Sequence, residues 1–182
     1  MRTLVLLFPL LLTACAQQQA ATPNEVPHQV PTVQMTVVAT SLNRWPYAAP
    51  ITFAIPDSLM YAKVQGKPWL PPFKQAARDY LIGLGLREAP ESEANVLLAI
   101  GVLGEKEDAD SVLFSRLGMD PGVTTSKKGT VALVLKDRQS STKLWSAALQ
   151  ASSDMPINVN AARDRAAQSL IEQMMMRLPS AQ

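Results

Sequence analysis

The chain has few of the side chains that usually carry catalysis. Its 182 residues include one cysteine, Cys15, and one histidine, His28, and only 5% of them are aromatic. A single thiol cannot form a disulfide or a cysteine-based zinc site within one chain. His28 stands among prolines near the start of the chain, where a Ser-His-Asp triad would lack a rigid support. We therefore expect no catalytic residue, no metal site and no cofactor, and predict that the protein is not an enzyme.

Charge of one sign and long apolar runs are also scarce. Lysine and arginine number 17 against 15 aspartates and glutamates, which gives a net charge of +2 at pH 7. This near balance differs from the strongly basic surface of nucleic-acid-binding domains, so no nucleic-acid partner is expected. A membrane-spanning helix needs about 20 apolar residues. The apolar run of residues 4–12 is too short for that role.

The N-terminus has the layout of an export signal. One arginine precedes the apolar run of residues 4–12, and the run ends in Leu12-Thr13-Ala14-Cys15. These four residues resemble the lipobox of bacterial lipoproteins. The resemblance implies cleavage between Ala14 and Cys15, a diacylglyceryl group on the Cys15 thiol, and acylation of the new amino group with a fatty acid such as palmitate.

A lipid anchor at this position predicts where the protein resides. One acyl chain binds a membrane marginally, whereas two or more hold a protein stably, at about 0.8 kcal/mol per buried CH2. In Gram-negative lipoproteins with this motif, an aspartate after the cysteine favours retention in the inner membrane, but here the residue is Ala16. We therefore expect the periplasmic face of the outer membrane. The alternative is an ordinary cleaved signal followed by a free thiol at Cys15.

The rest of the chain divides into a tether and one domain. Residues 1–14 are interpreted as the signal peptide and residues 15–32 as the lipidated cysteine with a flexible tether. The tether is broken by prolines and has too little apolar surface to offset the entropy of ordering it. Residues 33–182 are interpreted as a single α+β periplasmic domain, a length that suits one hydrophobic core.

Five segments of the domain have strand patterns rich in β-branched or alternating apolar residues. They are residues 33–39, 51–55, 94–102, 130–135 and 143–150. The last two are expected to form a hairpin whose turn covers residues 136–142. Trp145 alternates with small and polar neighbours and is expected to pack beneath a helix. Residues 112–116 predict a further strand, short or irregular.

Two segments have the spacing of amphipathic helices. The first has its apolar stripe at Phe73, Ala76, Ala77, Tyr80, Leu81 and Leu84. Gly85 follows it at the position of a left-handed C-terminal cap. The second, from about residue 161 to 178, has Ala162, Ala166, Leu170, Met174 and Leu178 on one face, widened by Ala167, Ile171 and Met175. Asn158 or Asn160 is its candidate N-cap.

Together these elements predict an α+β two-layer sandwich, with a mostly antiparallel sheet of about five strands and both helices on one face. Two local features have alternative interpretations. Trp45 and Tyr47 are either an exposed contact site or a cap on a sheet edge. The charged segment of residues 105–110 is interpreted as a solvated turn, because it lacks the spacing of a calcium-binding loop.

Several stretches of the chain resemble the DUF4136 domain of bacterial lipoproteins. Residues 47–56 are similar to its opening pattern, Y-x-T-F-a-W-x-P. Residues 81–86 are similar to L-x-x-k-G-y, and residues 94–98 to A-D-L-L-V. Residues 129–137 are similar to G-T-L-x-i-D-l-x-D, and residues 144–147 to L-v-W-r-G. The chain departs from this pattern at Ile55, Asn95 and Ala147, where tryptophan, aspartate and glycine are common. The resemblance implies a cell-envelope lipoprotein and no catalytic residues, because members of the family are largely of unassigned role.

We expect the protein to act as a non-enzymatic binding or accessory protein of the cell envelope, with the membrane and an envelope protein or amphiphile as partners. This hypothesis predicts an exposed apolar patch or sheet edge. A second hypothesis, a carrier of a lipid or other amphiphile, predicts a pocket between helices and sheet. A third, an enzyme that uses Asp108 and Asp110, requires convergent carboxylates with perturbed pKa values.

Overall fold

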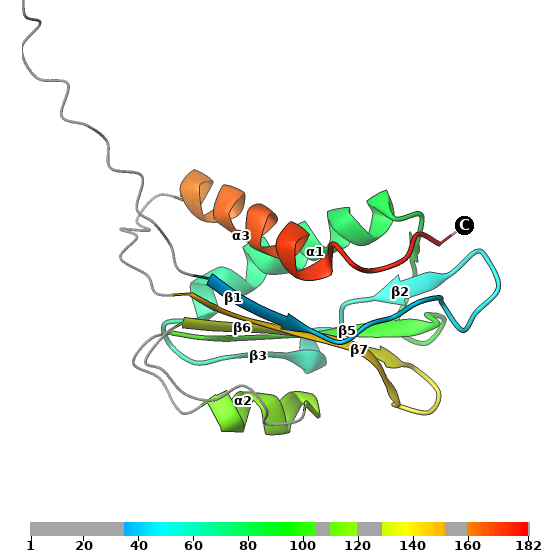
Figure 1. Ribbon diagram of the computed structural model, residues 1–182, viewed down its shortest axis with the longest axis horizontal. Helices are drawn as coiled ribbons and strands as arrows, with labels where there is room; N and C mark the ends of the chain where they lie inside the picture. The colour runs from blue at the N-terminus through cyan, green and yellow to red at the C-terminus, as the bar shows by residue number, and fades with distance from the viewer. Residues whose placement is uncertain (1–34, 105–109, 120–128, 152–159, 182) are drawn as a thin grey trace, which may run out of the picture. The chain divides into compact units, whose positions relative to one another are not determined.

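A mixed β-sheet with helices on both faces forms the centre of the fold (Figure 1). The computed structural model describes residues 35–104, 110–119, 129–151 and 160–181. Within these ranges the sheet has seven strands in the order β1-β7-β6-β5-β2-β4, with β3 also paired to β5. The strands are β1 Met35–Ala39, β2 Thr52–Ala54, β3 Met60–Ala62, β4 Arg87–Glu88, β5 Val96–Leu103, β6 Gly129–Asp137 and β7 Lys143–Ala151. The helices are α1 Leu70–Gly83, α2 Asp110–Leu117 and α3 Asn160–Met175, with short 3-10 turns at Asp57–Leu59 and Lys67–Trp69.

The predicted hairpin is confirmed as an antiparallel pair of the sheet. β6 and β7 pair in register from Thr130 opposite Gln150 to Leu135 opposite Trp145. β5 joins the other side of β6 and is also antiparallel to it. Trp145 is fully buried on the side of the sheet that faces α1 and α3, as its alternation predicts.

The expected sheet of about five mostly antiparallel strands is wrong in number and in part of its direction. β2 runs parallel to β5 and to β4, and β3 runs parallel to β5. The cause is the crossover of the chain from β2 through α1 to β5, a connection that places the two strands parallel in one sheet. β3 and β4 have three and two residues, which is too short for a strand period to show in the sequence.

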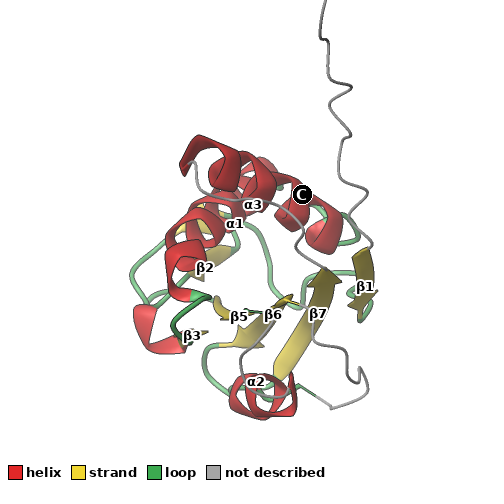
Figure 2. Cartoon of the chain, turned by 90° about the vertical axis from the view of Figure 1, so that its left-hand side faces the viewer, coloured by secondary structure: helices red, strands yellow, loops and turns green. Residues whose placement is uncertain are grey.

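The two predicted helices lie together on one face of the sheet, as expected (Figure 2). Phe73, Ala77 and Leu81 are the buried residues of α1. Gly85 has φ +92° and follows the end of α1, so it forms the predicted left-handed cap. The Leu86 N–H then donates to the Leu81 carbonyl. Only glycine adopts this backbone conformation without strain.

The buried line of α3 is rotated relative to the predicted stripe. Its centre lies on Ala167, Ile171, Met174 and Met175, whereas the sequence pattern placed only Met174 in the stripe and the other three at its border. The helix packs against α1, β7 and β1, so its buried sector is defined by three neighbours. Met176 is 69% exposed. The candidate cap Asn158 lies outside the described residues.

Helix α2 corrects the prediction of a strand at residues 112–116. The segment is helical, and Leu113, Phe114 and Leu117 are buried against the sheet face opposite α1 and α3. Gly101 of β5 leaves room for them, because a Cβ there would overlap the Leu113 Cδ1 atom. The two-layer description therefore holds for α1, α3 and the sheet, and α2 adds a short third layer over part of the other face.

Candidate binding surfaces

The residues predicted for lipidation and cleavage, Cys15 and Ala14, lie outside the described residues, as does Asp108. Asp110 is the first residue of α2, and its side chain is not described. The described helices are too short or too polar to cross a membrane. Across the same residues, no three histidine, cysteine or acidic side chains come close enough together to bind a metal ion.

Residues from three of the stretches that resemble the DUF4136 pattern meet at one end of the sheet. The Tyr47 hydroxyl donates to the Asp137 carboxylate, which also accepts from the Ser140 N–H at 2.6 Å and the Ser140 hydroxyl at 2.7 Å. The bond from Tyr47, followed by those from Ser140, lowers the pKa of Asp137 from 3.8 to about 2. Burial and then the bond to Asp137 raise the pKa of Tyr47 above its usual value of 10.0. This pair ties the loop before β2 to the β6–β7 hairpin.

A second tie at the same end joins β2 to the start of β5. The Asn95 Oδ1 atom accepts from the Thr52 N–H and from the Thr52 hydroxyl, each at 2.9 Å. The Asn95 N–H in turn donates to the Thr52 hydroxyl at 3.0 Å. Arg138 adds a bond from its Nε atom to the Ala94 carbonyl at 2.7 Å. These hydrogen bonds connect β2, the start of β5 and the turn after β6, so the role of these side chains is structural.

Trp45 and Tyr47 are not an exposed contact site. Trp45 is 8% exposed and donates its indole N–H to the Pro179 carbonyl at 2.8 Å. The bond connects the loop before β2 with the chain after α3. Trp45 belongs to the buried core, and Tyr47 packs against that core.

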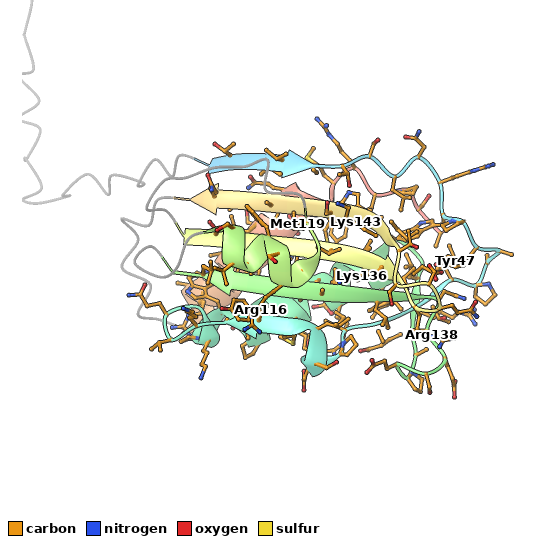
Figure 3. The ribbon with its side chains drawn as sticks, turned by 90° about the horizontal axis from the view of Figure 1, so that it is seen from below. Tyr47, Arg116, Met119, Lys136, Arg138 and Lys143 are labelled. Atoms are coloured by element: carbon orange, nitrogen blue, oxygen red, sulfur yellow. The ribbon has the colours of Figure 1, made fainter. Side chains whose placement is uncertain are left out.

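The face of the sheet that carries α2 has a basic end. Figure 3 shows Lys136, Lys143 and Arg138 near the β6–β7 hairpin, beyond Met119 at the end of α2, while Arg116 points toward the β3 side. The Arg116 guanidinium lies 4.8 Å from the centre of the Tyr61 ring, which is a cation–π distance. The positive charges are thus spread over several elements and do not converge on one point.

The space between the helices and the sheet is filled by side chains. Phe73 and Leu81 from α1, Ile171 from α3, and Leu133 and Trp145 from the sheet are all 1% exposed or less. These side chains form part of the core between the described helices and the sheet.

A groove instead runs along the outer side of the helix pair, between α1 and α3. It has a volume of about 830 Å³ and is open to solvent. Pro71, Pro72, Gln75, Ala76, Asp79, Tyr80, Gly83 and Leu84 line it from α1, and Asp164, Gln168 and Glu172 line it from α3. Sequence reasoning missed this groove, because its two walls are about 90 residues apart in the chain.

The other candidate surface is the edge of the sheet at β1. Within the described residues β1 pairs only with β7, from Met35 opposite Ala151 to Ala39 opposite Ala147. Val37 and Val38 are 38% and 48% exposed. They stand on opposite faces of the strand, because side chains alternate along β-structure.

Comparison with known proteins identifies the fold. No family model and no curated protein matches the sequence. Among solved structures, a DUF4136 family protein from Bacteroides thetaiotaomicron superposes with a TM-score of 0.53 at 10% identity, over 81% of this chain and 97% of the other. A PelC dodecamer from Paraburkholderia phytofirmans gives 0.51 at 17% identity, over 82% of this chain and 100% of the other. The chain therefore has the fold of a DUF4136-like domain, and the resemblance inferred from its sequence is confirmed at the level of the fold.

Proposed function

We propose that this chain is a lipoprotein of the outer membrane that faces the periplasm and acts by binding, not by catalysis, as an accessory protein of the cell envelope. The lipobox that ends at Cys15 supports the anchor. The DUF4136-like fold supports an envelope protein of this general kind. On this proposal the anchor sets the location, residues 15–32 set the reach, and the folded domain supplies the contact surface.

The observation that carries the proposal is the edge at β1, which pairs on one side only among the described residues. An edge strand presents unpaired N–H and C=O groups, and proteins usually protect such edges with lysine, proline or a bulge. The sequence of β1, Met-Thr-Val-Val-Ala, has neither charge nor proline. Its exposed side chains Val37 and Val38 are β-branched and suit a further strand. The edge is therefore suited to bind an uncharged extended segment.

A second copy of the chain is the partner that we propose for this edge. Two β1 strands bring no like charges together, and their pairing would extend the antiparallel β1–β7 ladder. Anchoring to one membrane raises the local concentration of copies and favours their association. The PelC protein of similar fold was solved as a dodecamer, which is a property of that protein. For this chain, assembly is part of our proposal.

Site-specific photo-crosslinking in living cells tests the proposal directly. A photoreactive amino acid at Val38 is expected to give an adduct of two copies of the lipoprotein. The same amino acid at Val64, which is 81% exposed and lies outside the strands, is the matched control and is expected to give none. Adducts at Val38 with other proteins only, or equal self-adducts at both positions, would contradict self-assembly through β1.

A charge placed on the edge gives an independent measurement. Val38→Lys should abolish association of the full-length lipoprotein in detergent, as measured by sedimentation velocity, because pairing would bury an uncompensated charge. Val64→Lys adds the same charge away from the edge and should associate as the wild type does. A wild-type protein that remains monomeric at membrane-like concentrations would exclude this mode of action.

A further inference from the structure

The groove between α1 and α3 is lined by charge of one sign. Asp79 contributes from α1, and Asp164 and Glu172 contribute from α3. The lining residues include no lysine, arginine or histidine. Carboxylates on both walls favour a ligand that carries positive charge along its length.

The lysine and arginine nearest to the groove on α1 are paired with acidic groups outside it. The Lys74 Nζ atom lies 2.6 Å from the Asp57 carboxylate, and the Arg78 Nε atom lies 2.9 Å from the Glu88 carboxylate. Both cations are thus paired with carboxylates outside the lining, and Arg78 also donates from Nη1 to Gln75 of the lining at 2.9 Å. Neither cation pairs with Asp79, the one carboxylate that α1 contributes to the groove.

Side-chain amides position two of the carboxylates. The Gln75 Nε2 atom donates to Asp79 at 2.8 Å, and the Gln168 Nε2 atom donates to Glu172 at 3.1 Å. Each pair spans four residues, so one helical turn fixes the orientation of each carboxylate. Burial, followed by the charge of Glu172, raises the pKa of Tyr80 between the walls, so this phenol stays neutral.

The remaining lining is apolar and small. Pro72, Ala76 and Leu84 are partly buried and expose apolar atoms to the groove. Gly83 has no side chain, and a Cβ there would meet no atom within 4 Å. The groove thus has room for apolar side chains between its carboxylates, as in helix-in-groove recognition.

The tether of this chain does not match the groove in charge. Residues 15–32 contain Glu25 and no lysine or arginine. A segment of that composition would bring negative charge to three carboxylates. The tether is therefore not the ligand that this charge pattern favours.

We infer that the groove between α1 and α3 docks a basic amphipathic segment of another protein, with lysine or arginine side chains on Asp79, Asp164 and Glu172 and apolar side chains over Ala76 and Leu84. The surface lies on the helices and not on the β1 edge. Its occupation is therefore independent of the assembly proposed above, and each of the two proposals can fail alone.

The test uses fluorescent peptides and the full-length lipoprotein in neutral detergent. The probe is a helical peptide of lysine and leucine, about as long as α1, with the lysines on one face. Fluorescence anisotropy is expected to show saturable binding. A glutamate–leucine peptide of the same pattern should not bind, and a lysine–serine peptide should bind more weakly, because it lacks apolar contacts. Equal binding of both lysine peptides would overturn the inference.

Matched variants separate the groove from general charge attraction. Asp164→Asn with Glu172→Gln should weaken binding of the lysine–leucine peptide about fivefold, the expected loss for two exposed ion pairs. Glu91→Gln with Glu93→Gln removes the same charge from exposed residues outside the groove and should leave binding unchanged. Equal weakening by both double variants would overturn the inference.

A third variant fills the groove and keeps every charge. Gly83→Trp places a large side chain where the backbone has open space, so the fold should be retained, and this can be checked by circular dichroism. Binding of the lysine–leucine peptide should be lost. Unchanged binding would show that the peptide binds elsewhere. If the groove variants instead abolished self-association, the groove would belong to a second copy, which would also overturn the inference.

Discussion

Tyr47, Thr52, Asn95 and Asp137 come from three stretches of the chain and meet at one end of the sheet. Each forms a hydrogen bond that joins strands or loops distant in sequence. The role of Asn95 explains why it can stand where the DUF4136 pattern has aspartate. Its Oδ1 atom acts as an acceptor, and a carboxylate oxygen provides the same function. At these positions the DUF4136-like pattern therefore corresponds to residues whose hydrogen bonds connect strands and loops at this end of the sheet.

We expect Tyr47→Phe to lower the free energy of unfolding by about 1 kcal/mol, the usual contribution of a partly exposed hydrogen bond. The loop before β2 would lose its bond to Asp137, while the ring would remain in place. Urea denaturation followed by circular dichroism measures the effect. Tyr61→Phe is the control, because the described residues supply no hydrogen bond to the Tyr61 hydroxyl. Equal effects of the two variants would show that the Tyr47 bond contributes nothing specific.

The same pair predicts a pH dependence. Because the pKa of Asp137 is lowered from 3.8 to about 2, its contribution to stability is present above pH 4 and is lost as the pH falls toward 2. Because the pKa of Tyr47 is raised above 10.0, its contribution is present below pH 10 and is lost at higher pH. The difference in stability between wild type and Tyr47→Phe should therefore narrow between pH 4 and pH 2. A constant difference over that range would contradict the assignment.

Among the elements, α2 shows most clearly how packing overrides local pattern. Residues 112–116 contain valine, leucine and phenylalanine, which suggest a strand, yet the segment is a helix. Leu113 and Leu117 lie one turn apart and both contact the position of Gly101 on β5. The flat surface at Gly101, together with Ala99 and Ala132, accepts a helix. This complementarity involves residues from three separate elements, so it could not be predicted from the segment alone.

We expect Gly101→Ala to destabilise the protein by about 1–3 kcal/mol, the usual cost of an overpacked site. The added Cβ would overlap Leu113 Cδ1 and lie 2.9 Å from Leu117 Cδ1, which displaces α2. Gly83→Ala is the matched control. It adds the same methyl group at a helical position with open space and should raise stability by about 0.5 kcal/mol. Thermal unfolding of both variants measures the difference, and equal melting temperatures would contradict this account of α2.

The whole molecule presents two separate surfaces from one core. The β1 edge is apolar and uncharged, and the groove between α1 and α3 is acidic. On the proposals made above, the β1 edge would join copies of the chain and the groove would bind another protein. This arrangement agrees with a binding role in the envelope and depends on the predicted anchor at Cys15.

The anchor is tested on the full chain by labelling with radioactive palmitate and by membrane fractionation. We expect the wild type to incorporate the label and to sediment with the outer membrane, because two or more acyl chains anchor stably. Cys15→Ala should lose the label and the outer-membrane location. Ala16→Asp should keep the label and move to the inner membrane. Label retained in Cys15→Ala would contradict lipidation at this residue.

By itself the sequence determined the hairpin of β6 and β7, the helix that ends at Gly85, and the placement of α1 and α3 on one face, because each depends on a local period or cap. It also predicted a lipid anchor, from the four residues Leu12-Thr13-Ala14-Cys15. Only the tertiary structure decided the parallel pairing of β2, β3 and β4 with their neighbours, the helix α2, the position of β1 at the edge of the described strands, and the groove. These features arise where residues distant in the chain pack together. The spacing of apolar residues within one segment does not indicate which other segments will pack against it.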